Sequence, residues 1–204
     1  MDFSCELADG IVLRPVQAAD AGPLAGALQS NRSHLAPWEP VRAEEFYTVE
    51  GQRELIRRRR DDLDAGTALS MVLAGGDGIL GLLTLSSMVR GAFQNAHLGY
   101  WIAQSVQGRG LMTAAVAAAT EIAKDGLGLH RLEAATLVHN MASQRVLEKN
   151  GFEAYGTARA YLRIAGQWQD HRIYQRLLLP PRRLGRAVWD RPDDGPLRHA
   201  AARA

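Results

Sequence analysis

A glycine-rich loop that leads directly into an apolar helix is the segment of this sequence with the most evident chemical use. Gln107-Gly-Arg-Gly110 is followed by a predicted helix over Leu111–Lys124. The first amides of a helix have no partner within the helix and carry partial positive charge, so they bind phosphate groups. Glycines at 108 and 110 let such a group approach the backbone, because they lack a Cβ. Arg109 would add a direct charge contact.

Two common phosphate-binding loops do not fit this segment. A P-loop needs Gly-Lys followed by Ser or Thr, and the sequence contains no Gly-Lys. A dinucleotide-binding fingerprint needs a third glycine where Thr113 stands, and a tight turn where Ala103–Gln107 intervene. Two alternatives remain, namely a phosphate cradle of another kind or a simple turn made by two glycines.

A second polar segment follows a later predicted strand and opens a later predicted helix. Asn140 stands where an N-cap is expected, and Ser143 falls in the first turn, close to the same strand end. Asn150-Gly151 ends that helix, since glycine suits the left-handed position after a helix. Both polar segments therefore lie at junctions between a strand and a helix.

The elements that position these segments alternate between strands and helices along one α/β domain. The apolar periodicity predicts strands over 10–15, 69–74, 79–88, 95–102, 131–138, 161–164 and 168–179, and helices over 18–29, 49–64, 111–124 and 141–149, with 31–40 as an ordered loop or a short helix. We expect residues 1–179 to form this domain and 180–204 to be an Arg/Pro/Ala-rich tail.

Length and composition exclude several other classes of protein. The chain has 204 residues, 47% hydrophobic and 23% charged, which is ordinary for one globular domain. No apolar run reaches the ~18 residues of a membrane helix, and residues 1–10 carry no secretory signal, so we expect a cytoplasmic protein with no membrane contact. Cys5 is the only cysteine, and the six histidines lack metal-site spacing, so we expect no metal.

Charge is distributed unevenly along the chain. Residues 180–204 hold six arginines and three aspartates, a net charge of +3, so the preceding residues contribute −1 to the total of +2. The tail is either a solvated appendage or a weak contact for the ribosome or RNA. Arg57–Arg60 lies in a predicted helix, so the four side chains spread around the helix axis. They form either a solvated helical face or a contact for an acidic partner.

The two polar segments together resemble the GNAT superfamily of acetyl-CoA-dependent N-acetyltransferases, and more closely the ribosomal-protein-alanine N-acetyltransferases of the RimJ type. Matching stretches are Asn31-Arg-Ser-His-Leu-Ala-Pro-Trp-Glu-Pro40, Val89-Arg-Gly-Ala-Phe93, Leu98-Gly-Tyr100, Gln107-Gly-Arg-Gly-Leu-Met112 and Gly166-Gln-Trp-Gln-Asp-His171. The resemblance implies a mostly antiparallel sheet of about seven strands flanked by helices, with splayed fourth and fifth strands.

The resemblance also implies a site for acetyl-CoA, the only cofactor we expect. The implied acetyl-CoA residues are Tyr100, Trp101, Ile102, Gln107, Gly108, Arg109, Gly110, Leu111, Met112, Thr113, Asn140 and Ser143. The backbone of 100–102 would pair with the pantetheine arm, 108–113 would cradle the pyrophosphate, and Asn140 would hydrogen-bond an arm carbonyl. Ser143 would present its hydroxyl to the departing thiol.

Two positions depart from the pattern of the family. Leu147 stands where many relatives place a tyrosine that protonates the thiolate, which leaves Ser143 as the candidate for that role. Ala160 stands where relatives carry an acidic residue beside the substrate amine. Glu39 could accept the amine's proton through water, or be a plain loop carboxylate, and His97 could do so if it faces the cleft. An α-amine has a pKa near ~8, so a base helps without being indispensable.

Three functions are compatible with these residues. The first is acetylation of a protein N-terminal α-amine, with a ribosomal protein beginning in Ala or Ser as the implied substrate, by direct attack on the thioester. Trp38, Glu39, His97 and Tyr161 are the expected substrate-binding residues. The second is acetylation of a small-molecule amine. The third is a non-catalytic acetyl-CoA-binding module.

Overall fold

The strand-forming stretches come together as one sheet in the order β1-β2-β3-β4-β5-β6-β8-β7. The computed structural model describes residues 3–76 and 78–178, and the statements below concern these residues. The strands are β1 Cys5–Glu6, β2 Val12–Pro15, β3 Leu69–Gly75, β4 Gly78–Val89, β5 Asn95–Ile102, β6 Arg131–Leu137, β7 Glu153–Ile164 and β8 Gln167–Leu177. Every neighbouring pair is antiparallel except β5 and β6, which are parallel.

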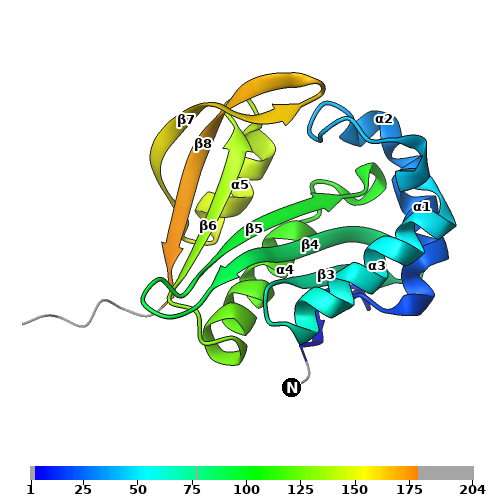
Figure 1. Ribbon diagram of the computed structural model, residues 1–204, viewed down its shortest axis with the longest axis horizontal. Coiled ribbons are helices and arrows are strands. Elements are labelled where there is room, and N and C mark those ends of the chain that lie inside the picture. Colours follow the sequence, from blue (N-terminus) through cyan, green and yellow to red (C-terminus); the bar gives the residue numbers. More distant parts are fainter. Residues whose placement is uncertain (1–2, 77, 179–204) are drawn as a thin grey trace, which may run out of the picture.

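Helices cover both faces of this sheet (Figure 1). The helical segments are η1 Ala18–Asp20, α1 Ala21–Ser30, α2 Arg32–Leu35, η2 Glu44–Tyr47, α3 Val49–Asp64, η3 Gln104–Val106, α4 Leu111–Glu121, a π-helical turn η4 Ile122–Gly126, and α5 Met141–Lys149. Strand alternation gives each face its own core. Leu24, Ile56 and Val72 are buried on the α1–α3 face, and Leu83 and Val116 on the α4 face.

The sheet separates between β5 and β6. Their paired residues run only from Asn95 with Arg131 to Leu98 with Ala134. Beyond this point β5 continues beside β4 as far as Ile102, while β6 continues beside β8 as far as Leu137. The predicted splay is therefore confirmed. It lies between the fifth and sixth of eight strands, one place later than the predicted fourth and fifth, because the sequence pattern did not predict the short first strand β1.

The two arms of the split sheet meet again through loops at their far ends. The amide of Ala165, in the β7–β8 turn, donates to the carbonyl oxygen of Glu39 at 2.9 Å. Trp38 lies against His139, which follows β6, with ring centroids 5.6 Å apart. Figure 1 shows the tip of the β7–β8 hairpin reaching toward the loop after α2. The two arms are therefore in contact at both ends of the splay.

Most predicted elements are confirmed, and the differences have local causes. The helices predicted over 49–64 and 141–149 match α3 and α5. Strand β7 begins at Glu153, directly after Gly151-Phe152, where we expect extended structure to restart, and includes the predicted strand at 161–164. Two register shifts and a positive φ of 47° at Ala160 interrupt its alternation, so the sequence pattern does not show it as one strand. The expected tail at 180–204 lies outside the described residues. In 3–76 and 78–178, no helix combines the length and apolar character required to cross a bilayer.

Candidate active site

A cavity of about 560 Å³ opens where β5 and β6 separate. It is lined by β5, by the glycine loop and the first turn of α4, by the first turns of α5 and by the end of α2. All the expected acetyl-CoA residues except Arg109 line it, namely Tyr100, Trp101, Ile102, Gln107, Gly108, Gly110, Leu111, Met112, Thr113, Asn140 and Ser143. The fold thus brings both polar segments of the sequence to one place.

The glycine loop presents the start of α4 to this cavity without obstruction. Gly110 is the N-cap of α4 with φ 79°, and Gly108 has φ 74°, a left-handed region that side chains rarely adopt. No atom outside the adjacent residues lies within 4 Å of where a Cβ would stand at either glycine. The unpaired amides of the first helical turn are therefore accessible to an anionic group such as a pyrophosphate.

Arg109 takes a different place from the one expected. Its guanidinium binds the carboxylate of Asp9 at 2.6 Å, and both side chains are about half exposed. The ion pair holds Arg109 toward the segment before β2, and Arg109 does not line the cavity. In this structure the positive character of the loop comes from backbone amides.

Two hydroxyl groups meet across the splay. The Oη atom of Tyr100 on β5 lies 2.9 Å from the Oγ atom of Ser143 on α5. Asn140 fixes the start of α5, because its Oδ1 atom accepts from the Ser143 amide at 3.1 Å. Burial raises the pKa of Tyr100 to about 12, so its phenol stays protonated as a hydrogen-bond donor. The Tyr100 hydroxyl also donates to the Ser143 carbonyl oxygen at 3.2 Å, so the pair places two linked hydroxyls beside the cavity.

Tyr100 was expected to contribute its backbone to acetyl-CoA binding, and no role was predicted for its hydroxyl group. Leu98, Tyr100 and Ile102 alternate along β5 and share the face that packs on α4 and α5. This alternation was visible in the sequence. The position of α5 relative to β5 depends on the splay, and the sequence pattern did not show which side chain would lie opposite Ser143.

On the other face of β5, the side chains of His97 and Trp101 flank a bare stretch of backbone. Gly99 lies between them on this face, with nothing within 4 Å of a would-be Cβ. Trp101 lines the cavity, whereas His97 does not. His97 Nε2 stands 3.8 Å from the Oε2 atom of Glu133 on β6.

Glu133 is anchored firmly beside His97. Its carboxylate accepts hydrogen bonds from Asn95 at 3.0 Å and from Tyr155 at 2.9 Å, and pairs with Arg131 at 3.0 Å. Burial works to raise the pKa of Glu133, but these hydrogen bonds and the charges of Arg131 and His97 outweigh it and lower the pKa. Glu133 is thus a fixed negative charge that can orient His97.

The remaining expected substrate residues divide between the cavity and its surroundings. Trp38 lines the cavity, and Glu39 follows it, partly buried. Burial raises the pKa of Glu39, although the charge of Arg42 opposes the shift. Tyr161 packs edge-on against His171, with ring centroids 5.6 Å apart, and lies outside the cavity lining. Among residues 3–76 and 78–178, no three His, Cys, Asp or Glu side chains are grouped to hold a metal ion.

Comparison with known proteins agrees with this geometry. The model of the acetyltransferase (GNAT) domain family matches residues 11–153. The [ribosomal protein uS5]-alanine N-acetyltransferase of Escherichia coli (strain K12) is 38% identical over 165 residues, which cover 80% of this chain and 85% of that protein.

Solved structures are similar over the same region. The ribosomal-protein-S5-alanine acetyltransferase from Vibrio fischeri superposes with a TM-score of 0.82 at 32% identity, covering 85% of this chain and 96% of that one. Mycobacterium smegmatis RimJ in complex with CoA-disulfide gives a TM-score of 0.80 at 30% identity, covering 85% of each chain.

The matched region extends from β2 to the beginning of β7 and includes both polar segments. The chain belongs to the GNAT family of N-acetyltransferases, enzymes that take their acetyl group from acetyl-CoA.

Proposed function

We propose that this enzyme acetylates the N-terminal α-amine of a protein, and that its substrate is a ribosomal protein. The observation that carries the proposal is the cavity at the splay, which joins an open anion-binding loop to a pair of hydroxyls and leaves Gly99 bare on the opposite face. The relatives named above, which are ribosomal-protein-alanine acetyltransferases, support the choice of substrate.

The residues present fit acetyl-CoA, which supplies the acetyl thioester when bound. Gly108, Gly110 and the first turn of α4 would hold its pyrophosphate through backbone amides. The β5 backbone over 100–102 has no strand partner on the β6 side and would pair with the pantetheine arm. The side-chain amide of Asn140 would donate to an arm carbonyl, since its oxygen is already engaged with Ser143.

Transfer requires an uncharged amine on one side and a stabilised thiolate on the other. The acceptor nitrogen attacks the thioester carbon, its proton leaves to a base, and the sulfur takes the electron pair of the broken C–S bond. Tyr100 and Ser143 would hydrogen-bond that sulfur, and so take the role of the family tyrosine whose position is occupied by Leu147 here.

Glu39 is the proton acceptor we assign, acting through water. Glu39 follows Trp38, which lines the cavity, and its raised pKa brings its basicity nearer to that of the amine. His97, oriented by Glu133, is the alternative.

The function is tested by mixing the purified protein with acetyl-CoA and a library of short peptides that differ in their first residue. Mass spectrometry should find the acetyl group on the α-amine of a subset of peptides, those beginning with Ala or Ser first among them. Peptides with a blocked α-amine and a free lysine serve as the control. Turnover of polyamines or other small amines in place of peptides would contradict the proposal, and so would acetyl-CoA binding without transfer.

Replacing Gly110 by leucine should weaken acetyl-CoA binding by about 10-fold or more, because a side chain would stand between the phosphate and the amides. Gly128→Leu is the matched control. Gly128 also has a positive φ, 62°, and open space around it, but does not line the cavity. Isothermal titration with acetyl-CoA measures both variants. Equal affinities would remove the glycine loop from the site.

Removing the two hydroxyls should slow the chemistry and leave binding almost unchanged. We expect the double variant Tyr100→Phe, Ser143→Ala to lose about 100-fold in kcat, with its KM for acetyl-CoA within about threefold of the original value. Tyr155→Phe, which removes a hydroxyl bound to Glu133 outside the cavity, is the control. An unchanged kcat in the double variant would exclude this pair from the mechanism.

Loss of the base should produce a pH-dependent defect. For Glu39→Gln we expect the largest loss of kcat/KM below about pH 8, where the α-amine is protonated, and recovery above it, where solvent provides the neutral amine. Glu45→Gln, on an exposed neighbouring segment, is the control. If His97→Gln shows this profile and Glu39→Gln does not, the proton goes to His97.

A further inference from the structure

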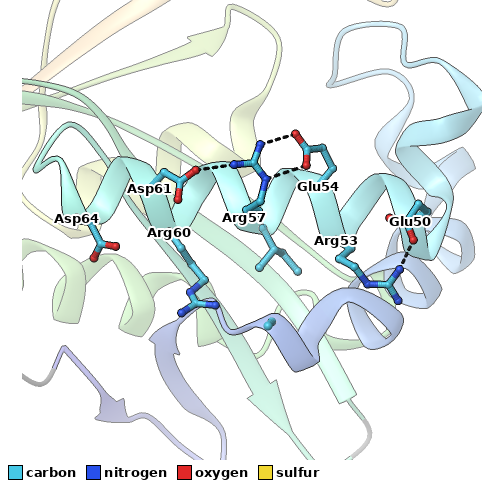
Figure 2. Close-up of a pocket in the computed structure, with 9 residues that line it drawn as sticks. Glu50, Arg53, Glu54, Arg57, Arg60, Asp61 and Asp64 are labelled. Carbon is cyan, nitrogen blue, oxygen red and sulfur yellow. Dashed lines mark hydrogen bonds and ion pairs between the residues drawn. The ribbon is translucent and has the colours of Figure 1, made fainter.

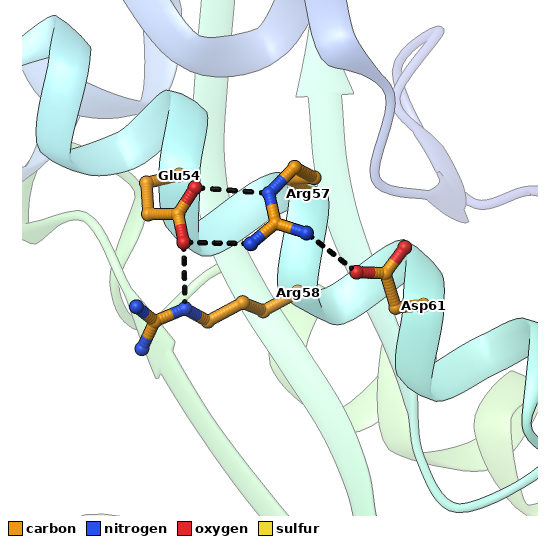
Figure 3. A network of polar contacts seen from close by, with 4 residues as sticks. All are labelled: Glu54, Arg57, Arg58 and Asp61. Carbon is orange, nitrogen blue, oxygen red and sulfur yellow. Dashed lines mark hydrogen bonds and ion pairs between the residues drawn. The ribbon is translucent and has the colours of Figure 1, made fainter.

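The arginines on the outer face of α3 are balanced by carboxylates of the same helix. Arg57 and Arg58 both donate to Glu54, and Arg57 also reaches Asp61 (Figure 3). A second cavity, of about 440 Å³, follows this helix and is lined by side chains of both signs, Arg60 and Asp61 among them (Figure 2). This balance of charge agrees with the solvated helical face, one of the two interpretations of the sequence.

The cavity at the splay differs in its charge. Arg145 and Lys149 of α5 line it, and among the residues that the structure describes no Asp or Glu does. With Ala142 and Val146 they form one face of α5, at the spacing of neighbours on a helix. Both basic side chains are exposed, and neither forms an ion pair within 3–76 and 78–178. The cavity therefore holds two positive charges that no carboxylate balances.

The end of α5 is held against the first turn of α4. The side-chain amide of Asn150, which directly follows Lys149, donates to the carbonyl oxygen of Thr113 at 3.2 Å. Lys149 follows Ser143 by six residues, a rise of about 9 Å along the helix. Lys149, with Arg145 one turn before it, thus stands toward the open amides of α4, at the end of the cavity away from the two hydroxyls.

CoA carries more negative charge than these amides alone would balance. Besides its pyrophosphate it has a 3′-phosphate on the ribose, a monoester with a charge of about −2 and three acceptor oxygens. The amides of the first turn of α4 would take the pyrophosphate. Arg109, the basic side chain of the glycine loop, is engaged with Asp9 and does not line the cavity. The positive charge available to a further phosphate is that of Arg145 and Lys149.

We propose that Arg145 and Lys149 bind the 3′-phosphate of acetyl-CoA, and that the enzyme thereby selects acetyl-CoA over thioesters that lack this phosphate. The inference rests on the pyrophosphate site of the proposed function and is independent of the acceptor. Arg145 would meet two phosphate oxygens with its fork of N–H groups, and Lys149 would add a point charge one helical turn away. Both are specificity-determining residues for the acetyl donor and take no part in the transfer itself.

The test compares acetyl-CoA with 3′-dephospho-acetyl-CoA by isothermal titration at low ionic strength. For the unmodified enzyme we expect acetyl-CoA to bind about 10-fold more tightly, because two partly exposed ion pairs are lost with the phosphate. The preference should fall to about threefold in Arg145→Met and in Lys149→Met, and to about onefold in the double variant. Added salt should reduce it in the unmodified enzyme.

A matched control removes the same amount of charge elsewhere. The double variant Arg58→Met, Arg60→Met loses two positive charges on exposed positions of α3 that do not line the cavity, and should keep the full preference. A melting curve shows that each variant folds. Both double variants should melt within about 2 °C of the unmodified enzyme, since the exchanged side chains are exposed.

Equal affinities of the unmodified enzyme for the two thioesters would overturn the phosphate site, and so would a preference that survives the loss of both Arg145 and Lys149. Equal losses of affinity for both thioesters in that double variant would assign the two side chains to the pyrophosphate and would also overturn the proposal. The titrations contain no acceptor. A preference that depends on Arg145 and Lys149, in an enzyme that acetylates none of the peptides, would therefore keep this site and overturn the proposed function.

Discussion

The site depends on one constraint, which is that the backbone amides and carbonyls on both edges of a strand need hydrogen-bond partners. β5 and β6 pair through four residues each and then diverge, so β5 keeps β4 on one side and loses its partner on the other beyond Leu98. Buried amides and carbonyls require partners. An extended, amide-containing arm can supply them, and the cavity at this edge also includes the starts of α4 and α5. If acetyl-CoA binds as proposed, its arm would complete the sheet along this edge of β5.

Because the splay lies between two arms, the chemical groups come from both. Tyr100 is carried by the arm of β4 and β5, and Ser143 by the helix that follows β6, and their hydroxyls meet at 2.9 Å. Glu39 belongs to the first arm, and its backbone carbonyl accepts a hydrogen bond from Ala165 of the second. The alignment of donor and acceptor therefore requires the arms to keep their relative position. The short parallel ladder and the bridging loops at the far end fix it.

The sequence was most informative where local chemistry determines structure. The glycine loop, the cap at Asn140 and the periodicity of α3 and α5 predicted their elements because each depends on near neighbours in the chain. Distant partners were not predictable in this way. Arg109 faces Asp9, one hundred residues earlier, and the Tyr100 hydroxyl finds Ser143 only through the splay.

The hydrogen bond between Ala165 and Glu39 gives the molecule a topological property. Together with the β5–β6 ladder, it turns the two arms into a closed ring around the site (Figure 1). A continuous polypeptide cannot enter a ring from the side, whereas a free chain end can be threaded through it. A lysine in the middle of a folded surface would have to bring two strands of chain through the opening, and an N-terminus brings only one. If the substrate is the N-terminal α-amine proposed above, this contact between the arms would favour a free chain end over a lysine within a continuous chain.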